Sequence, residues 1–137
     1  MSARNRQLTE QFFRDLSLGE FPASTFTEDA TFWTLTGGAG TKEKFQGGVK
    51  LLQSLFPNRL TYSIDSLVAD DVGAAAEVQS RGVLSTGQDF HNVHVFTFRF
   101  EGDRIASVKE YQNPDPVRAT LIPLMQAAAQ KMRDANA

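Results

Sequence analysis

Two stretches of the chain carry apolar residues at the spacing of a helix. In the first, one face would hold Leu8, Phe12, Phe13 and Leu16. This spacing predicts a helix from Ser2 to a stop signal at Gly19. In the second, the inward positions would be Phe45, Val49, Leu52 and Phe56. Thr41 is the predicted N-cap of this second helix, and Pro57-Asn58 ends it.

The segment between these helices predicts two short elements and a loop. Residues 24–29 are expected to form a short helix that carries Phe26. Residues 30–36 (ATFWTLT) are rich in β-branched and aromatic side chains, which predicts a strand. Residues 37–40 (GGAG) are expected to form a loop. No Lys-Ser or Lys-Thr follows them at the spacing of a phosphate-binding motif.

From Leu60 onward the apolar period changes to two, which predicts four consecutive strands near residues 60–68, 74–84, 90–100 and 104–112. Short connections make them antiparallel neighbours. Residues 117–133 predict a terminal helix with a kink or break at Pro123. An apolar sheet face needs a cover, and we expect the N-terminal helices to supply it. The predicted fold is therefore α+β, a curved antiparallel sheet rolled around helices with a hollow between them.

Composition narrows the class of protein. The 137 residues are 41% hydrophobic and 22% charged, which is typical of a single soluble globular domain spanning residues 1–137. A net charge of -2 gives no strong field toward nucleic acid or anionic lipid, so neither is an expected partner. Cysteine is absent, which excludes disulfides. No apolar run has the length of a membrane span or a signal core, so we expect a cytoplasmic protein.

Several segments match a known family in the same order along the chain: residues 18–20 (LGE), 26–33 (FTEDATFW), 77–82 (EVQSRG), 90–92 (FHN), 98–105 and 110–113. Together they cover nearly the whole sequence, although each is a loose pattern. Through these segments, taken together, the chain resembles the nuclear transport factor 2-like proteins, and within them the SnoaL-like branch. The resemblance implies a cone-shaped roll, usually dimeric, with a deep apolar pocket. That fold serves isomerases, cyclases, hydrolases, dehydratases and non-enzymatic adaptors, so it does not fix the chemistry.

Strand alternation predicts which side chains face the hollow. In residues 90–100 the even positions hold four Phe, and these are expected to face inward together with Asn92 and His94. The corresponding face of the preceding strand would hold Ala74, Ala76, Val78, Ser80, Gly82 and Leu84. Its small side chains leave space unfilled, which indicates a cavity. Trp33 and Tyr62 are expected to contribute to its walls.

The facing of the last strand depends on a bulge. Ile105 and Val108 both favour burial, yet their spacing is odd. A bulge near Ala106-Ser107 would reconcile them and turn Glu110 and Gln112 inward. Without it, Tyr111 and Asn113 would face the hollow. The resemblance to ketosteroid isomerases favours the bulged register, because the matching face lines their pocket.

Glu110 and His94 are the candidate catalytic residues. A carboxylate beside an imidazole fixes its tautomer and raises its basicity, which would give a proton-transfer pair. Alternatively, Glu110 is itself the base, with a pKa raised by apolar walls. Asn92 is a candidate for holding a carbonyl or oxyanion. The other candidate ligand-binding residues are Gln112, Trp33, Tyr62 and Phe96. A purely structural role, in which the buried polar groups satisfy one another, is the competing interpretation.

Several known chemistries do not fit these residues. The two His face opposite ways, so no metal is expected, and no cofactor is expected either. The Asp base of ketosteroid isomerases is matched here by Thr34, and their second Asp by Phe96. Phe12 and Phe13 stand where their Tyr would be. The Arg between two Asp of limonene epoxide hydrolases is missing as well, so neither reaction carries over.

The outward faces of the same strands predict an interface between copies of the chain. They would hold Glu77, Gln79, Arg81, Val93 and Val95. Glu77 and Arg81 lie roughly 13 Å apart on one strand, so they could pair only across a homodimer. The expected function is cofactor-independent proton transfer on a small apolar metabolite by an isomerase, cyclase, hydrolase or dehydratase. The alternative is a non-catalytic ligand-binding or dimeric adaptor domain.

Overall fold

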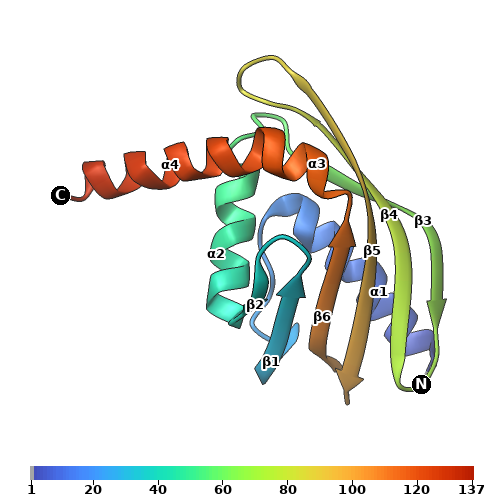
Figure 1. Cartoon of the computed structure of the whole chain (residues 1–137). Coiled ribbons are helices and arrows are strands. Elements are labelled where there is room, and N and C mark those ends of the chain that lie inside the picture. Colours follow the sequence, from blue (N-terminus) through green and yellow to red (C-terminus); the bar gives the residue numbers. More distant parts are fainter. Residues whose placement is uncertain (1) are drawn as a thin grey trace.

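The computed structural model, which describes residues 2–137, is built on one curved six-stranded sheet (Figure 1). Its strands are β1 (Phe26–Thr34), β2 (Gly38–Gly40), β3 (Thr61–Ala69), β4 (Gly73–Val83), β5 (Asp89–Glu101) and β6 (Arg104–Gln112). Its helices are α1 (Ser2–Leu18), α2 (Lys42–Gln53), α3 (Pro114–Pro116) and α4 (Ile122–Ala135), with a π-helical turn, η1, at Val117–Leu121. The strand order is β2-β1-β6-β5-β4-β3. The α+β fold and the antiparallel series β3 to β6 are confirmed.

The N-terminal half departs from the prediction at two places. Residues 24–29 were expected to be helical, but β1 already begins at Phe26, which pairs with Ile105 of β6. This pairing is parallel, unlike the others in the sheet. Gly38–Gly40 pairs with the end of β1 as β2, where only a loop was expected. In both places backbone pairing with a distant or returning strand outweighs the local residue preference.

The junction of α1, α2 and β3 is fixed by polar groups. Thr41 caps α2 as predicted, because its Oγ1 accepts the Lys44 N–H at 3.1 Å. α2 ends at Gln53, a buried side chain whose Nε2 donates to the carbonyls of Leu16 at 3.0 Å and Leu60 at 2.8 Å. Its Oε1 accepts the Leu60 N–H at 2.9 Å. One amide therefore ties the end of α1 to the start of β3.

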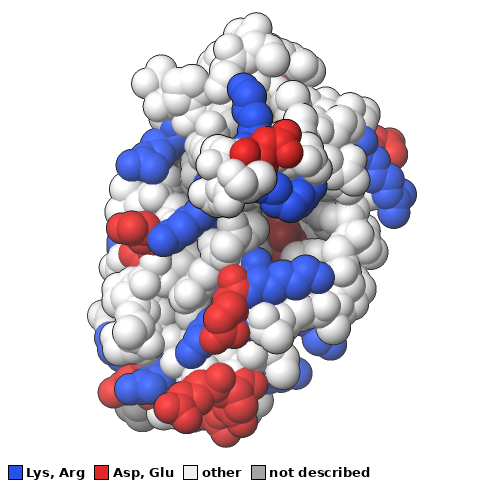
Figure 2. Space-filling model, turned by 90° about the vertical axis from the view of Figure 1, so that its left-hand side faces the viewer, with Lys and Arg blue, Asp and Glu red and all other residues white. Residues whose placement is uncertain are grey.

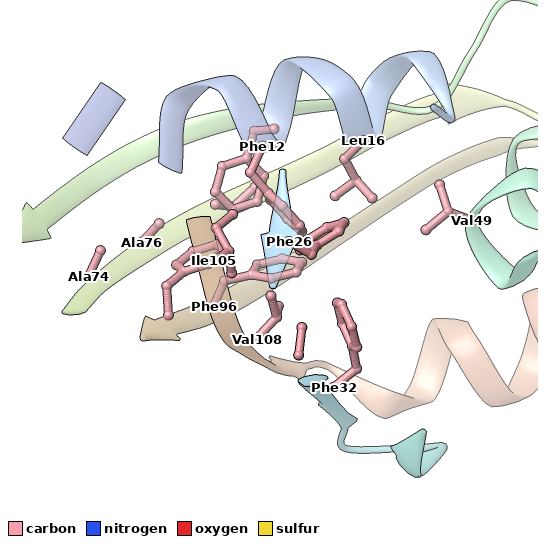
Figure 3. Packing of buried hydrophobic residues seen from close by; sticks show 14 of the residues in the cluster. Phe12, Leu16, Phe26, Phe32, Val49, Ala74, Ala76, Phe96, Ile105 and Val108 are labelled. Carbon is pink, nitrogen blue, oxygen red and sulfur yellow. The ribbon is translucent and has the colours of Figure 1, made fainter. Parts of the chain in front are cut away.

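Phenylalanines fill one end of the space between α1 and the sheet. The rings of Phe12 and Phe98 lie 5.1 Å apart and those of Phe13 and Phe96 lie 4.9 Å apart, both edge to face. Phe12 and Leu16 point from α1 toward the sheet, where Phe26 and Phe96 meet them (Figure 3). This end of the roll is solidly packed.

The C-terminal segment covers the other end, so the expectation that N-terminal helices alone cover the sheet was incomplete. Leu121 packs with Phe56, Leu60, Leu84 and Phe90 in a second apolar cluster. Pro123 follows the π-helical turn η1 within helical residues that continue from Pro114 to Ala135, so its missing N–H coincides with a local irregularity of the helix. α4 then extends away from the sheet (Figure 1). A hollow between charged side chains opens on the face seen in Figure 2. Among residues 2–137, no helix has the length and apolar character needed to cross a membrane.

Candidate functional site

A cavity of about 300 Å³ lies between the sheet, α2 and the C-terminal segment. Its walls are largely apolar and include Phe32, Phe45, Val49, Phe90, Phe96 and Leu121. Its polar lining includes residues of three neighbouring strands, with Ser80 on β4, His94 on β5 and Glu110 on β6. An apolar chamber with a few converging polar groups is the usual form of a small-molecule site.

A bulge in β6 turns Glu110 into this cavity. Arg99 pairs with Ser107 and Phe100 pairs with Ile105, which leaves Ala106 without a partner. From Ser107 onward the register therefore places Glu110 opposite Phe96 and Gln112 opposite His94, on the inner face. Tyr111 is exposed on the other face. The structure thus has the bulged register, one of the two alternatives open from the sequence.

Ser80, His94 and Glu110 form a continuous hydrogen-bonded chain. Ser80 Oγ lies 2.8 Å from His94 Nε2, and His94 Nδ1 lies 2.8 Å from Glu110 Oε2. Ser80 is completely buried, and the His94 and Glu110 side chains are 6% and 19% exposed. The sequence placed Ser80 on the inward face but gave it no role. The register could have revealed one, because Ser80 pairs with Asn92, two residues from His94.

The hydrogen bonds from Ser80 through His94 to Glu110 leave one oxygen of Glu110 free to act on a ligand. In the tautomer that carries its hydrogen on Nδ1, His94 donates a hydrogen bond to Glu110 Oε2, and its Nε2 accepts one from the Ser80 hydroxyl. Both imidazole nitrogens are then occupied. Glu110 Oε1 makes no hydrogen bond within residues 2–137, and Glu110 lines the cavity. The geometry therefore favours Glu110 as the group that exchanges protons, with His94 and Ser80 orienting it.

Tyr62 supplies a neutral phenol beside this pair. It lines the cavity, and its ring lies 5.6 Å from the His94 ring. Burial, and then the negative charge of Glu110, raise the pKa of Tyr62 well above its ordinary value. The phenol therefore keeps its proton and can donate a hydrogen bond to an oxygen atom in the cavity.

Asn92 and Gln112 also line the cavity, but their amides are engaged differently. Asn92 Nδ2 donates to the Asn113 carbonyl at 3.0 Å, and its Oδ1 accepts the Val93 N–H at 2.8 Å. The first of these bonds ties β5 to the residue that follows β6. Gln112 Nε2 donates to Thr36 Oγ1 at 3.0 Å, while its Oε1 is buried with no partner in the described chain. Gln112 therefore retains an acceptor for a ligand.

Of the three aromatic side chains expected to bind a ligand, Tyr62 and Phe96 line the cavity and Trp33 does not. Phe32 and Thr34 of β1 face inward, so alternation turns Trp33 to the outer face of the sheet. There its ring lies 5.0 Å from Tyr111. The position of Trp33 is therefore corrected. Within the described chain, no three His, Cys, Asp or Glu side chains lie close enough together to hold a metal ion.

Comparison with known proteins agrees with this architecture. Residues 12–108 match the family model of the SnoaL-like domain. An NTF2-like protein from Anabaena variabilis is 25% identical, with 81% of this chain and 87% of that chain covered and a TM-score of 0.70. IdmH, a candidate polyketide cyclase from Streptomyces antibioticus, is 16% identical, with 84% and 96% covered and a TM-score of 0.72. AclR, a candidate hydroxylase from Streptomyces galilaeus, is 14% identical, with 90% and 86% covered and a TM-score of 0.76. No curated protein matches the chain.

Proposed function

We propose that this chain, which belongs to the SnoaL-like domain family, binds a small apolar molecule and transfers a proton to or from it through Glu110. The observation that carries the proposal is the chain from Ser80 through His94 to Glu110, which ends in a free carboxylate oxygen inside an apolar cavity. By its name, the structural neighbour IdmH is a candidate polyketide cyclase, and ring closure by an enolate would begin with the same kind of proton transfer. No cofactor is part of the proposal.

The proposed step is proton abstraction next to a carbonyl group. Glu110 Oε1 takes the proton, the C–H bond breaks, and its electron pair moves to the carbonyl oxygen as an enolate. The Tyr62 hydroxyl donates a hydrogen bond to that oxygen, where negative charge develops. His94 holds the carboxylate in place during the transfer. Return of the proton to another carbon would give an isomer, and attack of the enolate carbon on a second carbonyl would close a ring.

The test uses an exchange reaction that does not require the natural substrate. Cyclic ketones such as 2-tetralone exchange the hydrogens next to the carbonyl in D₂O, and NMR measures the rate. The wild-type protein should accelerate this exchange, and Glu110→Gln should reduce the acceleration by about 100-fold or more, because general-base catalysis contributes on that order. Glu101→Gln, at the exposed end of β5 outside the cavity lining, is the matched control and should change little.

The alternative function, ligand binding without turnover, predicts a different result. Ketones would bind, but the wild-type protein and Glu110→Gln would leave their exchange rates equally unchanged across a panel of cyclic ketones. That outcome would reject proton transfer. It would leave the Ser80–His94–Glu110 chain with a structural role, in which the buried polar groups satisfy one another.

We also propose that the protein forms a homodimer through the outer face of its sheet. Val93, Val95 and Tyr111 are 50%, 40% and 42% exposed there, beside Trp33. Clustered exposed apolar side chains are typical of an interface. Sedimentation should give a dimer for the wild-type protein and a monomer for Val95→Glu, whereas Val72→Glu, at an exposed position in the turn between β3 and β4, should remain dimeric. A monomeric wild-type protein would refute this assembly.

A further inference from the structure

The polar atoms that line the cavity are unevenly satisfied. Both ring nitrogens of His94 and both the Nδ2 and Oδ1 atoms of Asn92 are hydrogen-bonded within the protein. Gln112 Oε1, by contrast, is buried without a partner in residues 2–137. A buried acceptor without a donor is unfavourable. The cavity therefore suits a ligand that brings a hydrogen-bond donor, such as a hydroxyl group, to Gln112.

The two ends of the cavity differ in exposure and in charge. Gly37, Gly38, Thr41 and Lys44 are exposed lining residues and mark the mouth, whereas Ser80 and His94 are buried. Figure 2 shows Lys and Arg side chains beside the hollow on this face. The charges of the lining are thus separated, with Glu110 farther in and Lys44 at the entrance.

Lys44 is available to an anionic group. It is the one Lys or Arg among the lining residues of the described chain, and within that chain no carboxylate lies within ion-pair distance of it. Its stem passes over Gly40, where an added Cβ would lie 3.2 Å from Lys44 Cδ. An anion deeper in the cavity would meet the negative charge of Glu110, so the mouth is the favourable place for it.

The apolar walls of the cavity favour a flat apolar body. Phe32 and Phe45 contribute two rings stacked 4.5 Å apart, and Val49 and Leu121 contribute aliphatic side chains. We infer that the molecule of the proposed function is a cyclic ketone with an apolar ring body that also carries a hydroxyl and a carboxylate group, with the hydroxyl reaching Gln112 and the carboxylate held at the mouth by Lys44. This inference rests on the proposed function, because it concerns the same cavity.

The carboxylate is tested with 2-naphthoate and its neutral analogue 2-naphthamide, whose affinities are measured by calorimetry. Lys44→Met should weaken 2-naphthoate binding about fivefold, the size of an exposed ion pair, and leave 2-naphthamide unchanged. Lys50→Met is the matched control, because it removes the same charge from an exposed position of α2 outside the lining. It should change the affinity of neither compound. Equal effects of the two substitutions would overturn the assignment of Lys44.

The hydroxyl is tested with 2-naphthol and 2-methoxynaphthalene, which differ in the ability to donate a hydrogen bond. The wild-type protein should prefer 2-naphthol by about fivefold, the value of one hydrogen bond. Gln112→Met should remove this preference while 2-methoxynaphthalene still binds. A preference that survives in Gln112→Met would overturn the assignment of Gln112.

Two glycine variants separate failure of this inference from failure of the proposed function. Gly48 lines the cavity and Gly47 does not, and an added Cβ at either meets no atom within 4 Å. Gly48→Leu should therefore fill the cavity and abolish binding of all four compounds, whereas Gly47→Leu should bind them normally. If this holds but Lys44→Met and Gln112→Met have no effect, the inference is wrong and the cavity stands. If none of the compounds binds the wild-type protein, or if Gly48→Leu binds them normally, both this inference and the proposed binding function are wrong.

Discussion

The two ends of the inner sheet face share one strand but differ in content. At one end Phe98 of β5 meets Phe12 of α1, and rings fill the space. At the other end His94 of the same strand faces a cavity that is lined from α2 by Gly48. The alternation along β5 is the same at both ends. Strand periodicity therefore sets which side chains face inward, whereas the size of the opposing helix residues decides whether the space is filled.

The largest effect should come from the filled end. Phe12→Ala should lower the free energy of unfolding by about 3–5 kcal/mol, because it removes a fully buried ring and leaves a void. Met125→Ala, at a half-buried position that lines the cavity, should cost less than about 2 kcal/mol, because the space beside it is already empty. Urea denaturation measures both. Equal losses would mean that the two ends are packed alike.

A smaller effect of opposite sign should come from filling the hollow end. Gly47→Leu should stabilise the protein by about 0.8 kcal/mol, because Leu is the better helix former. Gly48→Leu should raise the free energy of unfolding further, since its side chain would also be buried against the cavity walls. Thermal unfolding at equal protein concentration compares the two. A loss of stability in Gly48→Leu alone would show that the cavity has no room for the added atoms.

The hollow end should also respond to alkaline pH through Tyr62. Its pKa is raised by burial and by Glu110, so the unfolded chain releases this proton at a lower pH than the folded one. The stabilisation is complete below the ordinary pKa of about 10 and declines above it, by at most about 1.4 kcal/mol per pH unit. Tyr62→Phe should show a shallower decline between pH 9.5 and about 11. Parallel curves for the two proteins would contradict the buried phenol.

The smallest effect should come from a turn beside the filled end. The Asp70 carboxylate accepts the N–H groups of Gly73 and Val72, each at 2.8 Å, and these bonds lower the pKa of Asp70. The stabilisation is therefore present above the ordinary pKa of Asp and is lost as pH falls through the lower folded value. Asp70→Asn should show a shallower loss of stability in acid. Urea midpoints between pH 3 and about 6 test this, and an unchanged slope would speak against it.

The sequence predicted most of the inner face because alternation is a local signal. It placed His94 inward from neighbouring phenylalanines, and the odd spacing of Ile105 and Val108 indicated the bulge that turns Glu110 inward. Ser80 lies on the inward face as well, but its contact with His94 depends on the register between two strands. That register follows from the turn between them and was not worked out from the pattern.

The errors arose where distant partners decide the conformation. Phe26 belongs to a strand because β6 pairs with it 79 residues later, as the partner Ile105 shows. Trp33 faces outward because its neighbours Phe32 and Thr34 face inward, and an aromatic side chain alone does not reveal its face. The lining by the C-terminal segment also escaped prediction, because a helical pattern does not say where the helix packs.

Ala106 has no partner in β5, so it is the position in β6 where the loss of one residue keeps the pairing on both sides. Deleting Ala106 would remove the bulge and still leave Ile105 opposite Phe100 and Val108 opposite Phe98. Inserting or deleting one residue between Val108 and Glu110 would move the side chains that follow to the opposite face of the sheet and point Glu110 outward. Insertion or deletion of one residue after Val108 would therefore remove Glu110 from the cavity, whereas deletion of Ala106 would keep Glu110 in place.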